Sequence, residues 1–277
     1  MTLALGEIIA KGKTKVFWEN LEDPQTEIGG FKDDITAGDG LKKDVIPGKA
    51  LIDWATNRDI MDFLKRHGVA MAYMESLDPG FFKVRKLSKI LKLEVVARRI
   101  ATGSIKDRGV AEGTVFNPPM IEIFYKDDFL HDPKLDDSFI AYLTEKKKGF
   151  DLFSRLKEMK LRQFLLLEAA FACFKCQYMD DKTEYGVILP NGEWDDKAEL
   201  ILVDEITAGS FRLWPWADGV TGIDYSVLED AMPLLNKAGQ LDKQVYRDGG
   251  DLQTVKSKFE QIAAITEKFK GIHIANL

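Results

Sequence analysis

Short apolar segments separated by turn-forming residues occupy most of the first hundred positions, and this spacing constrains the fold more than any other feature. Segments this short, bounded by Gly, Asn, Asp or Pro, predict β-strands rather than helices. We expect strands at residues 8–10, 15–18, 26–32, 69–75, 81–85 and 91–98. Residues 48–68 instead place apolar side chains at helical spacing and end at Gly68, a typical helix C-cap.

The pattern changes after Arg99. A strand at 121–125 precedes an amphipathic helix from about residue 150 to 178, and a β-hairpin follows at 183–205 around Asn191-Gly192. Further helices are expected near 225–237 and 252–269. We therefore predict an α+β protein with a small antiparallel β-rich lobe, residues 1–98, and a larger α+β lobe, residues 99–277.

The composition limits the classes of function. Hydrophobic residues make up 45% and charged residues 30% of the chain, as in soluble globular proteins. The net charge of −6 argues against general nucleic-acid binding, which needs a basic surface. No basic leader precedes an apolar block, and the most apolar later stretch is too short to span a membrane. We therefore expect a cytoplasmic protein that binds no membrane, and we interpret Cys173 and Cys176 as buried thiols rather than zinc ligands.

Two acidic residues are placed symmetrically in the predicted hairpin. Glu184 and Asp204 are equally distant in sequence from Trp194, so a loop centred on Trp194 places them opposite one another on one side of the sheet. Like charges in this position are destabilising unless a cation neutralises them. Mg²⁺, which binds one or two carboxylates together with substrate phosphates, is the natural candidate. If the loop is asymmetric, both carboxylates instead face water.

Two segments could bind phosphate. Gly12-Lys13-Thr14 matches the end of a P-loop, but Glu7 replaces its first glycine. The alternatives are an ordinary hairpin turn, or a glycine turn laid over nucleotide phosphates as in kinase lobes. In the second segment, Arg98 and Arg99 precede a Gly-Ser turn that ends at Ser104. That pattern suits an anion pocket, and it equally suits a capped helix with surface arginines.

Acidic and flexible residues are concentrated in residues 31–40, FKDDITAGDG. A surface turn is the simplest interpretation, since Asp bonds its own backbone and Gly reaches positive φ. A calcium-binding EF-hand loop is excluded because the twelfth position counted from Asp34 is Val45 rather than Glu. The rim of a site for phosphate and metal is the third interpretation.

Taken together, the motifs resemble one enzyme family. GKTK, DDITAGDG, VVARRIATGSIKDRG, NPPMIEIFYKDDFLHDP, DKTEYG and LVDEITAGSFRLWP occur in the order and spacing of the phosphoribosylaminoimidazole-succinocarboxamide synthases (SAICAR synthetases). The resemblance extends from about Glu7 to Arg247, and its most specific segments surround Arg98–Ser104 and Asp204–Trp214. One departure is Gly209, where many members of the family have an acidic residue before the cradle arginine.

This resemblance implies an enzyme of de novo purine biosynthesis with a two-lobe fold and ATP in the cleft. The implied reaction joins L-aspartate to the carboxylate of the carboxylated aminoimidazole ribonucleotide CAIR, giving SAICAR, ADP and phosphate with the help of ATP and Mg²⁺. The implied partners are therefore small molecules, and a homo-oligomer is a further possibility that the sequence leaves open. A catalytically silent nucleotide-binding or assembly protein, or a small-molecule kinase, are the alternatives.

The resemblance also implies roles for individual residues. Lys182, Asp204 and Arg212 are expected to be catalytic, and Glu184 and Asp204 to bind the metal. The residues expected to bind ATP with its metal are Lys13, Lys15, Lys126, Glu184 and Asp204. Those expected to bind the substrates are Asp34, Thr36, Gly38, Asp39, Arg98, Ser104, Asp180, Lys182 and Arg212. Among these, residues 34–39 match a loop that closes over the substrates, and Arg98, Ser104 and Arg212 match a phosphate cradle.

Overall fold

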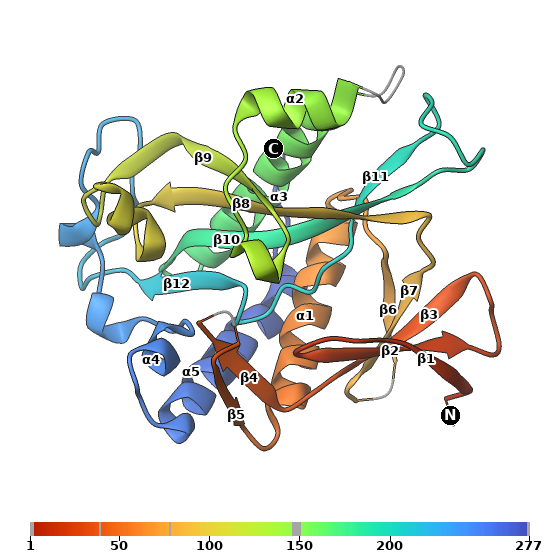
Figure 1. Cartoon of the computed structure of the whole chain (residues 1–277). Coiled ribbons are helices and arrows are strands. Elements are labelled where there is room, and N and C mark those ends of the chain that lie inside the picture. The colour runs from red at the N-terminus through yellow and green to blue at the C-terminus, as the bar shows by residue number, and fades with distance from the viewer. Residues whose placement is uncertain (1–2, 39, 78, 146–150, 276–277) are drawn as a thin grey trace.

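The computed structural model describes residues 3–38, 40–77, 79–145 and 151–275. An antiparallel sheet at the N-terminal end has the order β1-β2-β3-β7-β6 (Figure 1). Its strands are β1 (Leu5–Lys11), β2 (Lys15–Asn20), β3 (Thr26–Phe31), β6 (Tyr73–Ser76) and β7 (Phe81–Arg85). Gly12 lies in the turn between β1 and β2, where its amide donates to the Lys15 carbonyl oxygen. The strands predicted for this region are therefore confirmed.

A second antiparallel sheet is built around β10, the longest strand. Its strands are β8 (Lys89–Ile100), β9 (Val115–Tyr125), β10 (Cys176–Ile188), β11 (Glu199–Leu202) and β12 (Phe211–Pro215). One edge of β10 pairs with β8, and the other pairs with β12 near its start and β11 near its end. The central strand thus has a partner on each side, and residues from three neighbouring strands can converge on its face.

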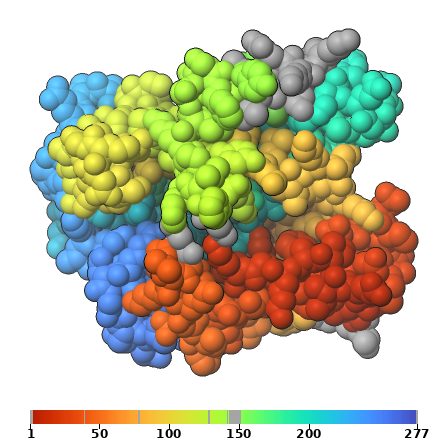
Figure 2. Space-filling view, in the orientation of Figure 1, coloured from red at the N-terminus to blue at the C-terminus, as the bar shows by residue number. Residues whose placement is uncertain are grey.

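A small hairpin lies apart from both sheets. It consists of β4 (Asp34–Ala37) and β5 (Lys42–Val45), and it contacts the short helix α4 (Gln244–Arg247). Lys42 Nζ donates to the Tyr246 carbonyl oxygen at 2.6 Å, and the Tyr246 hydroxyl donates to Asp44 Oδ2 at 2.8 Å. These contacts attach the hairpin, orange in Figure 2, to the C-terminal segment in blue.

Helices cover the second sheet and close the hydrophobic core. They are α1 (Lys49–Arg66), α2 (Asp137–Glu145), α3 (Leu152–Ala172) and α5 (Leu252–Thr266), with 3₁₀ turns at Gly103–Arg108, Asp128–Leu130, Met232–Leu234, Lys237–Gly239 and Glu267–Gly271. The Phe171 ring of α3 lies 5.3 Å from Tyr178 of β10 and 4.9 Å from Phe269 after α5. Buried aromatic contacts of this kind hold α3 and α5 against the sheet. In the described part of the chain, no helix is long and apolar enough to cross a membrane.

The α+β fold class and the helices predicted at 48–68 and 252–269 are confirmed. The helix predicted at 150–178 begins at Leu152, and residue 150 lies outside the described residues; its predicted end is wrong because the chain turns at Lys175 and Cys176 already begins β10. The helix predicted near 225–237 is also wrong, since only two short 3₁₀ turns form there. Cys176 is buried as predicted, whereas Cys173 is exposed. The lobe boundary proposed at residue 98 falls within β8 and stays a prediction.

Candidate active site

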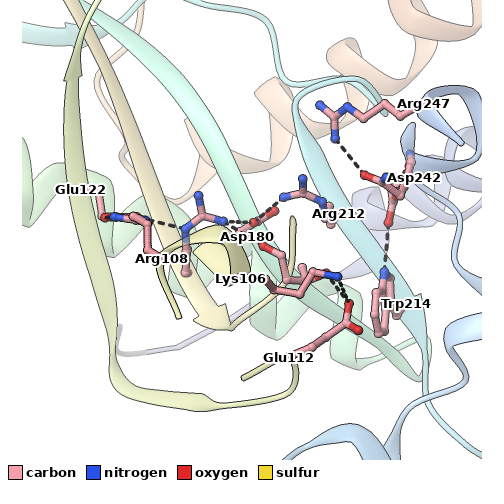
Figure 3. A network of polar contacts seen from close by, with 12 residues as sticks. Lys106, Arg108, Glu112, Glu122, Asp180, Arg212, Trp214, Asp242 and Arg247 are labelled. Atoms are coloured by element: carbon pink, nitrogen blue, oxygen red, sulfur yellow. Dashed lines mark hydrogen bonds and ion pairs between the residues drawn. The ribbon is translucent and has the colours of Figure 1, made fainter. Parts of the chain in front are cut away.

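Two arginines from different strands converge on one carboxylate of β10. Asp180 is paired in register with Arg98 of β8 on one side and with Arg212 of β12 on the other. Arg212 Nη1 donates to Asp180 Oδ2 at 2.6 Å (Figure 3), and Arg98 Nη1 donates to the same oxygen. Asp180 and Arg98 are both buried. The strand register therefore assembles a pair of guanidinium groups around a single negative charge.

Glu122 of β9 supports this arginine pair from the other side. Its carboxylate accepts hydrogen bonds from Arg98 Nε at 3.1 Å and Arg108 Nη1 at 2.6 Å, and it pairs with Lys134 Nζ at 2.9 Å. Burial raises the pKa of Glu122, but these three cations outweigh it and lower the pKa to about 2. Glu122 is thus a fixed negative charge that orients Arg98. No sequence motif indicated this role.

The turn after β8 brings its backbone against Arg212. Gly103 has φ +67°, and a Cβ atom at this position would lie 2.2 Å from Arg212 Nη2. Only glycine accommodates both the left-handed backbone and the guanidinium. The next residue, Ser104, lines the same cavity as Arg98 and Arg212. The structure therefore brings together all three residues of the predicted phosphate cradle.

A cavity of about 430 Å³ opens beside this cradle. Lys182 lines it two residues beyond Asp180, on the same face of β10, and donates to Glu94 Oε1 of β8 at 2.6 Å. The other residues that line the cavity come mainly from the second sheet and the C-terminal segment: Val96, Phe124, His131, Asp132, Asp181, Gly209, Ser210, Phe211, Asp242, Lys243 and Arg247. Gly209, where an acidic residue was expected by resemblance, contributes no charge to this wall.

Lys243 and Arg247 are cavity residues that sequence reasoning missed. They lie at α4, and Arg247 points toward Asp242, which in turn accepts a hydrogen bond from Trp214 Nε1 at 3.0 Å (Figure 3). Burial, together with the nearby charges of Arg247, Lys49 and Lys182, lowers the pKa of Lys243 to about 8. The segment DKQVYRD could have indicated them, because two cations one helical turn apart share a face.

A second cluster lies where the first sheet meets the end of the β10–β11 hairpin. Lys15 Nζ of β2 pairs with Asp204 Oδ1 at 2.8 Å and also with Glu205, while Thr14 Oγ1 donates to Glu205 Oε1 at 3.0 Å. Lys126 pairs with Glu184. Burial raises the pKa of Glu184, and the nearby charge of Asp204 adds to this effect. The two acidic residues are thus close enough to interact.

The predicted geometry of these two carboxylates is wrong in detail. Tyr185 pairs with Leu202, and the Val203 amide donates to the Glu184 carbonyl oxygen, so Val203 rather than Asp204 lies across from Glu184. The loop is therefore centred between Glu193 and Trp194 rather than on Trp194. The alternative interpretation is not borne out either, because both carboxylates are paired with lysines instead of facing water. The residue directly opposite Glu184 is Glu94, on the other neighbouring strand. Lys126 and Lys182 each contact one member of this acidic pair, which offsets its repulsion.

The remaining predicted residues lie around these clusters. Lys13 is exposed in the β1–β2 turn, and its side chain approaches Gly40, which lies between β4 and β5. Asp34 pairs with Lys32 at 3.2 Å, and neither it nor Thr36 nor Gly38 lines the cavity. Asp39 lies outside the described residues. The structure thus leaves the predicted roles of residues 34–39 as predictions.

Comparison with known proteins identifies a family. The model of the SAICAR synthetase family matches residues 8–265. A phosphoribosylaminoimidazole-succinocarboxamide synthase from Herpetosiphon aurantiacus is 35% identical and aligns over 96% of this chain and 99% of its own length. The crystal structure of such a synthase from Ehrlichia chaffeensis has a TM-score of 0.76 at 27% identity, covering 94% of this chain and 98% of the other. A SAICAR synthetase solved in complex with ADP has a TM-score of 0.75 at 27% identity, covering 98% and 100%. The chain belongs to the SAICAR synthetase family.

Proposed function

We infer that this protein is an ATP-dependent ligase that joins L-aspartate to the carboxylate of CAIR, giving SAICAR, ADP and phosphate. The observation that carries this proposal is the arrangement on β10. Asp180 lies in the arginine cradle and Glu184 in the cluster with Lys126, and Lys182 stands between them on the same face of the strand. A phosphorylated substrate and ATP could therefore approach one another along a single strand.

The chemistry explains why the two sites must adjoin. A carboxylate is a poor acyl donor because it would have to expel oxide. Transfer of the ATP γ-phosphoryl group to a CAIR carboxylate oxygen converts that oxygen into a leaving group. The amine of L-aspartate then attacks the carbon, the C–N bond forms, phosphate departs with the oxygen and a proton is released. For such a reaction the protein mainly positions its substrates and neutralises charge.

We assign the CAIR phosphate to the cradle of Arg98, Ser104 and Arg212. The two guanidinium groups provide forked donors suited to phosphate oxygens, and the Ser104 hydroxyl adds another donor. Asp180 fixes both arginines and lies beside the space in which a ribose would follow the phosphate. Lys182 is proposed to contact the reacting carboxylate, because its ammonium group lies farther along the cavity wall.

The ATP phosphates are assigned to the second cluster. Lys15 and Lys126 supply positive charge there, and we assign Lys13, exposed in the turn that precedes β2, to the same phosphates. The carboxylates of Glu184 and Asp204 are hard oxygen donors that fit Mg²⁺. Among the described residues no group of three or more His, Cys, Asp or Glu side chains is arranged to hold a metal ion. The two carboxylates of Glu184 and Asp204 suit Mg²⁺, which is commonly held by one or two carboxylates together with substrate phosphates. The ion would neutralise the charge developing on those phosphates.

L-aspartate is assigned to the part of the cavity near α4. Lys243 lies near the like charges of Arg247 and Lys182, and Arg247 lies near that of Arg212. Arg98 and Arg212, by contrast, already share Asp180. A dicarboxylate would relieve this repulsion and place its amine near the carboxylate of CAIR. The β4–β5 hairpin, attached to α4 through Tyr246, is proposed to close over the bound substrates.

Product formation with purified protein tests the proposal. Incubation with Mg-ATP, CAIR and L-aspartate should yield ADP and SAICAR in equal amounts, and omission of either CAIR or L-aspartate should abolish both. Tight ATP binding without turnover would indicate a silent nucleotide-binding protein. A stable phosphorylated product without an amide would indicate a kinase.

A further inference from the structure

A buried polar network lies behind β10, between this strand and helix α3. It joins Lys160 and Gln163 of α3 to Asp181, Thr183 and Tyr185 of β10, and all five side chains are almost completely shielded from solvent. No step of the proposed reaction uses these groups. Their concentration directly behind the strand that carries the site therefore requires another explanation.

An ion pair and several hydrogen bonds join the members of this network. Lys160 Nζ lies 2.8 Å from Asp181 Oδ1 and donates to Thr183 Oγ1 at 2.8 Å. Gln163 Nε2 donates to Asp181 Oδ2 at 2.7 Å, and Gln163 Oε1 accepts from the Tyr185 hydroxyl at 3.1 Å. The Thr183 hydroxyl is 3.2 Å from that of Tyr185. Two helix residues thus contact three alternate strand residues.

Such a network is an expensive way to stabilise a fold. Burial lowers the pKa of Lys160 and raises that of Asp181, so it disfavours the charged form of each. A buried ion pair is often no more stabilising than apolar residues of similar volume. Its hydrogen bonds are directional, however, and specify one arrangement of the groups that they join.

Side chains alternate between the two faces of β10, so the network on one face can fix the positions of the site residues on the other. Successive strand residues point to opposite faces, so Asp181 and Thr183 face α3 while Asp180, Lys182 and Glu184 face the substrates. Backbone pairing alone leaves irregularities on both sides of this segment. The register with β12 shifts between Tyr178 and Asp180, and the register with β8 shifts between Glu184 and Gly186.

We propose that Lys160, Gln163, Asp181, Thr183 and Tyr185 form a positioning network that fixes the rotation of β10 and thereby the three substrate-facing residues on its other side. The identity of the affected substrates rests on the proposed function. Lys160 and its partners are positioning residues, because they bond one another between α3 and β10, and only Asp181 among the five also lines the cavity.

A triple variant separates positioning from stability. Lys160→Met/Gln163→Met/Asp181→Leu replaces the ion pair and the amide bonded to it with apolar residues, and it leaves the Thr183 and Tyr185 hydroxyls bonded to each other. We expect a melting temperature no lower than that of the parent, together with at least a tenfold increase in KM for CAIR. Unchanged KM and kcat would overturn the proposal. If the triple variant does not fold, Tyr185→Phe is decisive: a KM for CAIR raised at least threefold supports positioning, and an unchanged KM refutes it.

Leu167→Ala provides the matched control, because Leu167 is fully buried on the same helix but lies outside the network. It should lower the melting temperature without raising KM; an equal rise in KM would show that general packing, not the network, is responsible. Amide hydrogen exchange of residues 176–188 adds a readout that needs no substrate. Exchange should be faster in the triple variant than in the parent, and equal rates would contradict the proposal. A parent that makes no SAICAR would refute only the proposed function.

Discussion

Replacing Asp180 with Asn should destabilise the free protein and strengthen its binding of phosphate. The substitution keeps the shape of the side chain but removes the negative charge shared by Arg98 and Arg212. Hydrogen bonds to charged groups contribute about 1.5–3 kcal/mol each, and Asn retains one acceptor oxygen. We therefore expect a loss of about 3 kcal/mol, at the lower end of the cost of breaking a buried ion pair. At about 2–3 °C per kcal/mol for a large domain, the melting temperature should fall by roughly 6–9 °C.

Inorganic phosphate should partly reverse this loss. With Asp180 neutral, two guanidinium groups remain for the anion, so phosphate should bind the variant more tightly than the parent. Tenfold tighter binding would add about 1.4 kcal/mol to the stabilisation by saturating phosphate. Thermal melts of both proteins across a phosphate titration measure the effect, with Asp195→Asn in the β10–β11 loop as the control. An unchanged melting temperature, or the same phosphate-induced shift in parent and variant, would refute this account of the cradle.

Three further predictions address the other groups of the site. Arg212→Lys should weaken CAIR much more than ATP, because an ammonium group cannot reproduce the forked contact with phosphate; equal losses in two calorimetric titrations would count against the cradle. Asp204→Asn should abolish activity but change stability in EDTA little, because the lost ion pair with Lys15 is offset by relief of the repulsion with Glu184. Mg-ATP should raise the melting temperature of this variant far less than that of the parent; an undiminished shift places the metal elsewhere. KM for L-aspartate should rise as pH increases through about 8, because Lys243 loses its charge there. Lys243→Arg stays charged and should remove this rise, whereas an identical pH profile in both proteins would exclude Lys243 from the aspartate site.

The regular part of the fold could be predicted from the sequence because the residues that begin and end its helices and strands act locally. Gly68 marks the end of α1, and the alternation of apolar residues marks the strands of the first sheet. The end of α3 carried no such mark: the turn at Lys175 uses a left-handed residue that is not glycine, so the helical pattern continued past it. The helix predicted at residues 225–237 was wrong for a different reason. Ala231 and Leu235 belong with Trp214 to a small second core, and only two 3₁₀ turns form there, the first of which contains Pro233.

Residues of the candidate site could be predicted from the sequence only where they belong to a recognised motif. Arg98, Ser104 and Arg212 were expected together, and the register of β10 with β8 and β12 explains how they meet. Glu94 and Glu122 were missed because each lies within a strand whose apolar neighbours give no reason to single it out. Asp204 lies one residue out of register with Glu184 because the loop is centred between Glu193 and Trp194, and the spacing of the two acidic residues cannot reveal where the loop is centred.

Oxygen transfer from CAIR to phosphate tests the central claim most directly. CAIR labelled with ¹⁸O in its carboxylate should be converted with Mg-ATP and L-aspartate, and the released phosphate analysed by mass spectrometry. If the carboxylate is activated by phosphorylation, each molecule of phosphate should carry one ¹⁸O atom derived from CAIR, with one such phosphate formed per SAICAR. Unlabelled phosphate alongside labelled SAICAR, or ADP release without SAICAR, would contradict the account.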